Sequence, residues 1–153
     1  MCIRDSTKGG RLHRSDDGLS PFKRGPDLFP RVPWNGRKYN APGSTRHVSI
    51  ELGDGHADVF YTRIGDAPER ILKSRVDLSR DWRKWRAGPP EDVMRPMEDW
   101  EGARFEILPS ALGAARSPVN QLRDPEIFSD ADGARYLLYA VAGEHGIAVA
   151  HLG

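Results

Sequence analysis

The sequence has one cysteine, Cys2, among its 153 residues. A single cysteine excludes an internal disulfide framework and a zinc site built from several cysteines. The five histidines are scattered without the spacing of metal ligands, so we expect no metal site and no cofactor. No apolar run reaches the length of a membrane-spanning helix, and we therefore expect no membrane partner.

Turn-forming residues are abundant instead. The chain contains 16 glycines and 12 prolines, a composition that favours short strands and many turns over long helices. Charged residues make up 29% of the chain, which is typical of a protein with a well-hydrated surface. The composition therefore predicts an all-β fold of ordinary domain size.

The net charge of +1 hides an asymmetry between the two parts of the chain. Residues 1–46 contain 10 Lys and Arg against 4 Asp and Glu, whereas residues 47–153 contain 13 against 18. A basic arm can bind nucleic acid. Here the positive charges are scattered among Gly, Pro and Asp, without a helix or a row of aromatic residues to present them. We therefore expect no nucleic-acid partner.

The chain divides into three segments. Residues 1–6 read as a translated sequencing-adapter scar, of the kind found in assembled environmental DNA, and contribute nothing to the fold prediction. Residues 7–45 lack periodicity and are rich in turn signals, which predicts a loop-rich segment with a strand near Leu28-Phe29. Residues 46–153 form the strand-rich part. The chain stops directly after a predicted strand, so we expect it to be truncated at its C-terminus.

In this third segment apolar and polar residues alternate as they do in half-buried strands. A first group of four strands is followed by a group of three, and residues 96–120 form a long loop between the groups. The predicted strands cover residues 47–52, 57–64, 70–78 and 91–95, and then residues 126–129, 135–141 and 147–152. Loops as long as this one are usually functional or inserted.

The two groups of strands form an internal repeat. Ile127 follows Ile50 at an offset of 77 residues, and Gly133 follows Gly55 at an offset of 78. Each group reads as a strand, a turn of acidic residues and glycine, an aromatic strand, a loop and a further strand. A repeated β-meander is typical of a β-propeller. A β-sandwich is the alternative, because it too has evenly spaced strands.

Three features carry a resemblance to a known family: Arg123-Asp124-Pro125 before a meander, the turn Asp130-Ala-Asp-Gly133, and Tyr136-Leu-Leu-Tyr139. With them the chain resembles the five-bladed β-propeller glycoside hydrolases, namely family 43 and its family 32 relatives. The resemblance covers residues 46–152. It implies a partial five-bladed propeller with about two blades, each a four-stranded antiparallel meander. It also implies a carbohydrate substrate.

The resemblance assigns a role to Asp124. In these enzymes an Arg-Asp-Pro motif at the start of an inner strand supplies a carboxylate that stabilises the transition state or tunes the general acid. Asp124 is therefore the catalytic candidate, and Arg123 beside it is expected to favour its charged form. The alternative is that Arg123 and Asp124 tie the start of the strand to a neighbouring blade.

The first blade departs from the family pattern. Its inner strand should begin with an Asp, but Arg46-His47 stands at that position. His47 could bond a sugar hydroxyl or carry a proton, or it could be a partly buried histidine bonded to backbone. Arg46 could contact substrate or phosphate, or form a surface salt bridge. The general acid belongs to a third blade, which the chain does not reach.

Two further substrate-binding candidates lie outside the motif. Glu144 follows the second strand of its meander, as Glu69 does in the first, and this recurrence could instead reflect the needs of the turn. Trp100 could stack on a sugar ring or be buried in the core.

Two functions remain open at this point. One is an enzyme that hydrolyses glycosides or, as in related five-bladed phosphorylases, cleaves them with phosphate. The other is a catalytically silent propeller that binds carbohydrate or protein. In either case we expect the 153-residue chain alone to be inactive and prone to aggregate, because two blades leave open sheet edges.

Overall fold

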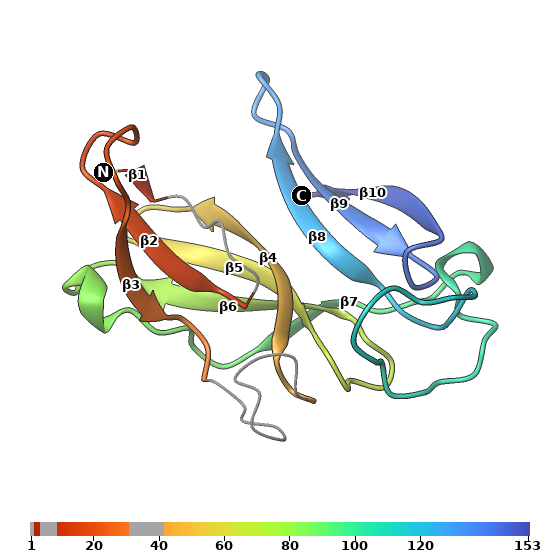
Figure 1. Ribbon diagram of the computed structural model, residues 1–153. Coiled ribbons are helices and arrows are strands. Elements are labelled where there is room, and N and C mark those ends of the chain that lie inside the picture. Colours follow the sequence, from red (N-terminus) through yellow and green to blue (C-terminus); the bar gives the residue numbers. More distant parts are fainter. Residues whose placement is uncertain (1, 4–8, 31–41) are drawn as a thin grey trace.

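A computed structural model describes residues 2–3, 9–30 and 42–153 of the chain. These residues form three small antiparallel β-sheets and two short 3-10 helices, so the predicted all-β class is confirmed (Figure 1). Within the described ranges there is no α-helix, and no helix is long and apolar enough to cross a membrane. The predicted adapter residues 1 and 4–6 lie outside the described residues.

The N-terminal sheet consists of β1 (Cys2–Ile3), β2 (Arg11–Ser15) and β3 (Lys23–Asp27). The segment predicted as loop-rich thus contains β2 and β3, and β3 ends directly before Leu28, next to the strand expected near Leu28-Phe29. A turn held by Asp17 joins β2 to β3: its carboxylate accepts hydrogen bonds from the Leu19 and Ser20 backbone amides. These bonds hold the pKa of Asp17 well below its usual range.

The middle sheet is a four-stranded meander in chain order: β4 (Thr45–Leu52), β5 (His56–Arg63), β6 (Ile71–Asp77) and β7 (Glu91–Met94). Its strands agree with the predicted ranges to within two residues. Gly55, in the turn between β4 and β5, has a φ of 70°, a conformation that glycine adopts without steric cost.

The third sheet contains β8 (Arg123–Ser129), β9 (Arg135–Val141) and β10 (Gly146–Leu152). Strand pairing confirms the internal repeat. Ile50 lies opposite Val59 in the middle sheet, and Ile127 lies opposite Leu137 in the third sheet. The first and second strands of the two meanders therefore correspond at offsets of 77 and 78 residues. This sheet has three strands among the described residues, where four were expected.

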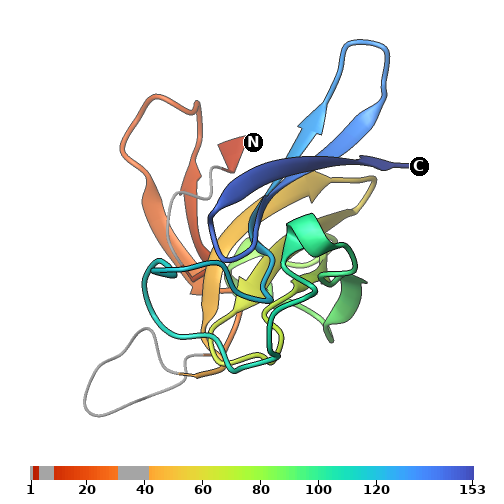
Figure 2. The same cartoon turned by 90° about the vertical axis from the view of Figure 1, so that its right-hand side faces the viewer.

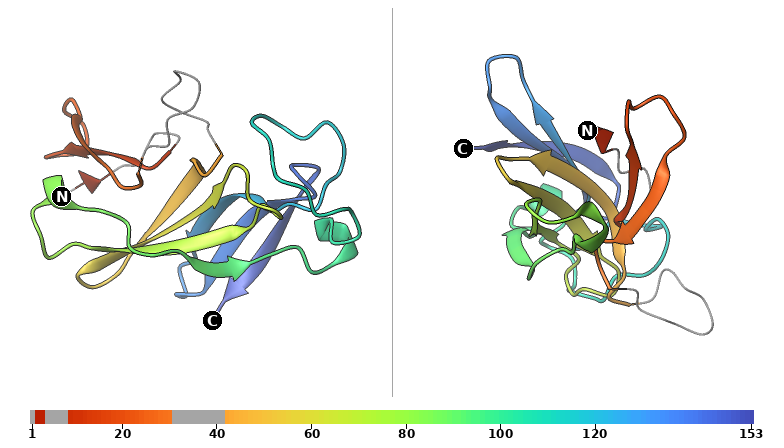
Figure 3. Two further views of the ribbon diagram at one scale, coloured as in Figure 1. Left: turned by 90° about the horizontal axis from the view of Figure 1, so that it is seen from below. Right: turned by 90° about the vertical axis from the view of Figure 1, so that its left-hand side faces the viewer.

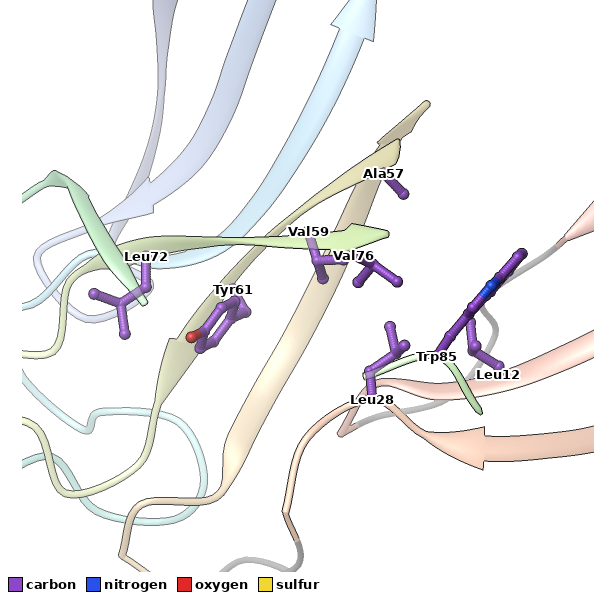
Figure 4. Close-up of a cluster of buried hydrophobic side chains, with 8 residues drawn as sticks. All are labelled: Leu12, Leu28, Ala57, Val59, Tyr61, Leu72, Val76 and Trp85. Atoms are coloured by element: carbon purple, nitrogen blue, oxygen red, sulfur yellow. The ribbon is translucent and has the colours of Figure 1, made fainter. Parts of the chain in front are cut away.

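The middle sheet lies between the other two (Figure 3). Along β5, Val59 and Tyr61 point to one side and Phe60 to the other, as the alternation of a strand requires. The first side packs on the N-terminal sheet in a core of eight buried residues (Figure 4): Leu12, Leu28, Ala57, Val59, Tyr61, Leu72, Val76 and Trp85. The second side packs on the third sheet in a core of six: Phe60, Ile71, Leu122, Leu137, Tyr139 and Val141.

The outer face of the third sheet is apolar and exposed. Phe128, Ile147 and Val149 have 51%, 83% and 63% of their surface accessible. Leu138 lies on this face. It is the repeat equivalent of Phe60 in the middle sheet, and Phe60 is buried against the third sheet. The outer face therefore has the character of a surface that packs on another sheet.

Two 3-10 helices lie in the connecting segments. The first, η1 (Trp82–Lys84), is capped by the Asp81 side chain. The second, η2 (Asp99–Glu101), lies in the long loop of residues 96–120, at the end of the molecule that faces the viewer in Figure 2. Glu101 ties this loop down, because its buried carboxylate accepts hydrogen bonds from the Met97 amide and the Tyr139 hydroxyl.

Candidate functional site

The candidate site lies where the first strands of the two meanders run side by side. Strands β4 and β8 belong to different sheets, yet they run in the same direction and touch along their length (Figure 1). His47 meets Asp124 near their starts, and the Ser49 hydroxyl accepts a hydrogen bond from the Ile127 amide further along. The repeat therefore brings equivalent positions of the two meanders into direct contact.

Both strands are irregular at this place. The register shifts by one residue between Thr45 and Val48 in β4, and between Arg123 and Glu126 in β8. Asp124 has a φ of 48°, which is uncommon for a residue other than glycine, although Asp tolerates it better than most. Bulges of this kind turn a side chain away from the regular pleat.

His47 and Asp124 form a hydrogen-bonded pair at the surface. The Nδ1 atom of His47 bonds to Oδ1 of Asp124, and the two side chains are 52% and 32% exposed. His47 is thus not bonded to backbone, as one reading of the sequence had it. An imidazole and a carboxylate in contact can together accept, hold and release a proton.

Arg123 does not pair with Asp124, contrary to expectation. Its side chain is 2% exposed and donates to Glu144 at 2.7 Å, to the Gly113 carbonyl at 2.9 Å and to Gln121. The physical reason is direction: Arg123 points into the interface between the sheets, and the bulge carries Asp124 outward toward His47.

Arg46 is also buried, at 3% exposure. Its guanidinium donates to both carboxylate oxygens of Glu69, at 2.8 and 3.1 Å, and to the Ala111 carbonyl at 2.8 Å. It therefore forms a buried ion pair rather than the surface salt bridge considered from the sequence, and its Nε and Nη2 atoms donate to protein groups.

Glu69 and Glu144 recur for a reason that the sequence did not reveal. In each meander the arginine near the start of the first strand binds the glutamate that follows the second strand, as Arg46–Glu69 and Arg123–Glu144. The similar separations within the two pairs, 23 and 21 residues, could have been noticed in the sequence as a sign of the pairing. Arg123 also approaches Glu69 at 3.4 Å, which joins the two pairs into one network.

Trp100 lies apart from this network. It belongs to η2 and is 57% exposed, so it is not the buried core residue that was the alternative reading. Among the contacts that the structure describes for residues 9–30 and 42–153, none joins Trp100 to His47 or Asp124. The same ranges contain no group of three or more His, Cys, Asp or Glu side chains that could hold a metal ion.

No protein-family model matches the chain, and no solved structure matches it. The chain is similar to the uncharacterized protein R118 of Acanthamoeba polyphaga mimivirus, with 42% identity over 147 residues. The match covers 94% of this chain and 41% of the viral protein, so the chain spans less than half the length of this relative.

Proposed function

We propose that the chain is part of a five-bladed β-propeller that cleaves glycosidic bonds, with Asp124 as one of its catalytic carboxylates. The observation that carries this proposal is the contact between His47 and Asp124. They occupy the same position in two repeated meanders, and they meet at the starts of adjacent first strands. A propeller brings the first strands of its blades together around an axis, where substrates bind.

The stacking of the sheets supports the propeller over the sandwich. A β-sandwich has two sheets whose outer faces meet solvent. Here the middle sheet is covered on both faces, and the third sheet offers a further apolar face with Ile147 and Val149 exposed. Sheets that stack in series, each covering the next, fit a radial array of blades.

Glycoside hydrolysis needs a pair of carboxyl groups, and in this proposal Asp124 is one of them. Glu69 is fully buried and bonded to Arg46 and Thr62, and Glu144 is bonded to Arg123. Asp124 and Glu144 are similarly exposed, at 32% and 31%, but Asp124 contacts His47 whereas Glu144 is held by the Arg123 guanidinium. The hydrogen bond with His47 restrains the Asp124 carboxylate from one side. The second carboxyl group comes from residues outside this part of the protein.

The test uses the full-length protein and a panel of aryl glycosides, with and without inorganic phosphate. We expect turnover in the wild type and a loss of at least about 100-fold in kcat for Asp124→Asn, because the variant keeps the shape but not the charge. Asp132→Asn, in an exposed turn of the same sheet, is the matched control and should keep full activity. An Asp124→Asn variant with undiminished turnover would refute the assignment.

A catalytically silent propeller that binds carbohydrate or protein is the second candidate. It is favoured by a single observation, namely that His47 stands where the family pattern has an acidic residue. This alternative predicts glycan binding without turnover, and binding that survives Asp124→Asn. Glycan-array binding together with product analysis separates the two.

A further inference from the structure

We infer that Glu69 is a positioning residue that holds His47 and Asp124 in contact. Neither the sequence motif nor the resemblance assigns Glu69 a role. Its carboxylate binds Arg46 and approaches Arg123, and these are the residues directly before His47 and Asp124. One buried side chain thus fixes the backbone on both sides of the pair. The inference concerns the geometry of the proposed site, but its test does not require catalysis.

The contacts of Glu69 are short and fully enclosed. Oε1 accepts from Arg46 Nε at 2.8 Å and from the Thr62 hydroxyl at 2.6 Å, and Oε2 accepts from Arg46 Nη2 at 3.1 Å. Arg123 Nε lies 3.4 Å from Oε2. The Glu69 side chain is 0% exposed, so water does not compete for these bonds.

The backbone of Glu69 adds a second link to the third sheet. Its carbonyl accepts a hydrogen bond from the Leu122 amide at 2.9 Å, and it forms an isolated parallel bridge with Gln121. Glu69 is therefore bound through both main chain and side chain to the residues that lead into β8. Its position determines where β8 begins relative to β4.

The register between β4 and β8 needs such a link. The two strands belong to different sheets, so no ladder of backbone hydrogen bonds aligns them. Side-chain links align them instead: Ser49 with Ile127, and the Glu69 network at the end where the pair lies. Glu51 with Arg135 adds a link from β4 to the neighbouring strand β9. A carboxylate that contacts a guanidinium from each strand restrains the position of both strands more tightly than a single hydrogen bond would.

The experiment follows the ring nitrogens of His47 by NMR in the full-length protein labelled with ¹⁵N-histidine, at an alkaline pH where the imidazole is neutral. Two-bond ¹H–¹⁵N correlations report which nitrogen carries the proton. Donation from Nδ1 to Asp124 makes the Nδ1–H tautomer dominant, so Asp124→Asn should return His47 to a mixture of tautomers. We expect Glu69→Gln to do the same without touching either residue of the pair.

Glu101→Gln is the matched control. Glu101 is another buried carboxylate, bonded to Tyr139 and to backbone amides but to neither arginine, so its loss should leave the His47 signal unchanged. If Glu69→Gln does not fold, Arg46→Lys carries the test, because lysine keeps the charge but loses the two-pronged contact.

The outcomes separate this inference from the proposed function. Loss of the Nδ1–H tautomer in Glu69→Gln or Arg46→Lys, with the signal kept in Glu101→Gln, supports the inference even if no glycoside is cleaved. An unchanged His47 signal in the folded Glu69 variant, or in Arg46→Lys where that variant is the one measured, overturns it even if the protein is an active hydrolase. Equal loss in all variants, Glu101→Gln included, also overturns it, because Glu69 would then act only through general stability.

Discussion

Replacing Arg123 by methionine should destabilise the protein far more than a typical loss of an arginine. The side chain is 2% exposed and bonds to Glu144, Gln121 and Gly113. Methionine fills a similar volume but leaves these acceptors without their donor. Removing one partner of a buried ion pair typically costs about 3–5 kcal/mol. Glu144 is 31% exposed, so we expect a cost in the lower half of this range.

The matched control is Arg80→Met. Arg80 also binds a carboxylate, Asp77, at 3.3 Å, but the two side chains are 73% and 55% exposed. Pairs of this kind are worth about 0–1 kcal/mol, since water and salt screen them. The structure therefore predicts a difference of about 2–4 kcal/mol between two substitutions with the same chemistry.

Urea denaturation of the full-length protein, followed by tryptophan fluorescence, measures this difference. Trp85 is 4% exposed in the core beside the middle sheet, so its emission should change when the stack of sheets opens. If Arg123→Met and Arg80→Met cost the same free energy of unfolding within about 0.5 kcal/mol, the reasoning about the buried network is wrong.

Three further predictions concern other parts of the fold. The Arg75 guanidinium lowers the pKa of Asp58. The pair therefore stabilises the fold above the ordinary aspartate pKa of about 3.9, and this stabilisation is lost as pH falls through the lower pKa of the folded state. Asp58→Asn should flatten the acid limb of a stability–pH curve. Gly102→Ala should cost more stability than Gly113→Ala in thermal melts: both have positive φ, but a Cβ at Gly102 would lie 2.3 Å from a backbone oxygen, whereas nothing lies within 4 Å at Gly113. Ile147→Lys should destabilise the full-length protein by more than about 1 kcal/mol if a further sheet covers this 83% exposed side chain, and a neutral effect in urea denaturation would count against the propeller.

The sequence predicted the middle and third sheets well because their strands alternate clearly and their turns carry glycine. Ile50 and Ile127 could be aligned before the structure was known, and the strand pairing places them as equivalents. The strands β2 and β3 were missed because Gly, Ser and Asp dominate that stretch and only Leu12 and Leu28 enter the core. Two buried residues are too few to produce a periodic signal.

The sequence predicted which residues belong to the candidate site, but not which of them contact one another. Asp124 and His47 were selected because they match in the repeat, but their direct contact depends on how two sheets pack, which local sequence does not encode. Arg123 and Asp124 are neighbours in sequence, so pairing them was natural, but successive side chains of a strand point in opposite directions. For Glu69 only a turn requirement or a catalytic role was considered, since its two arginine partners lie 23 and 54 positions away.

The parallel contact of β4 with β8 also has a consequence for the order of assembly. Each meander can pair its own strands through short turns, whereas the contacts between β4 and the third sheet span 77 to 84 residues. Closing such long loops is slow, so these contacts should form after the hairpins are in place. During synthesis the His47 side chain cannot contact Asp124 until β8 has left the ribosome. The contact between His47 and Asp124 is therefore acquired late, and a chain arrested before that point has folded sheets but lacks the candidate site.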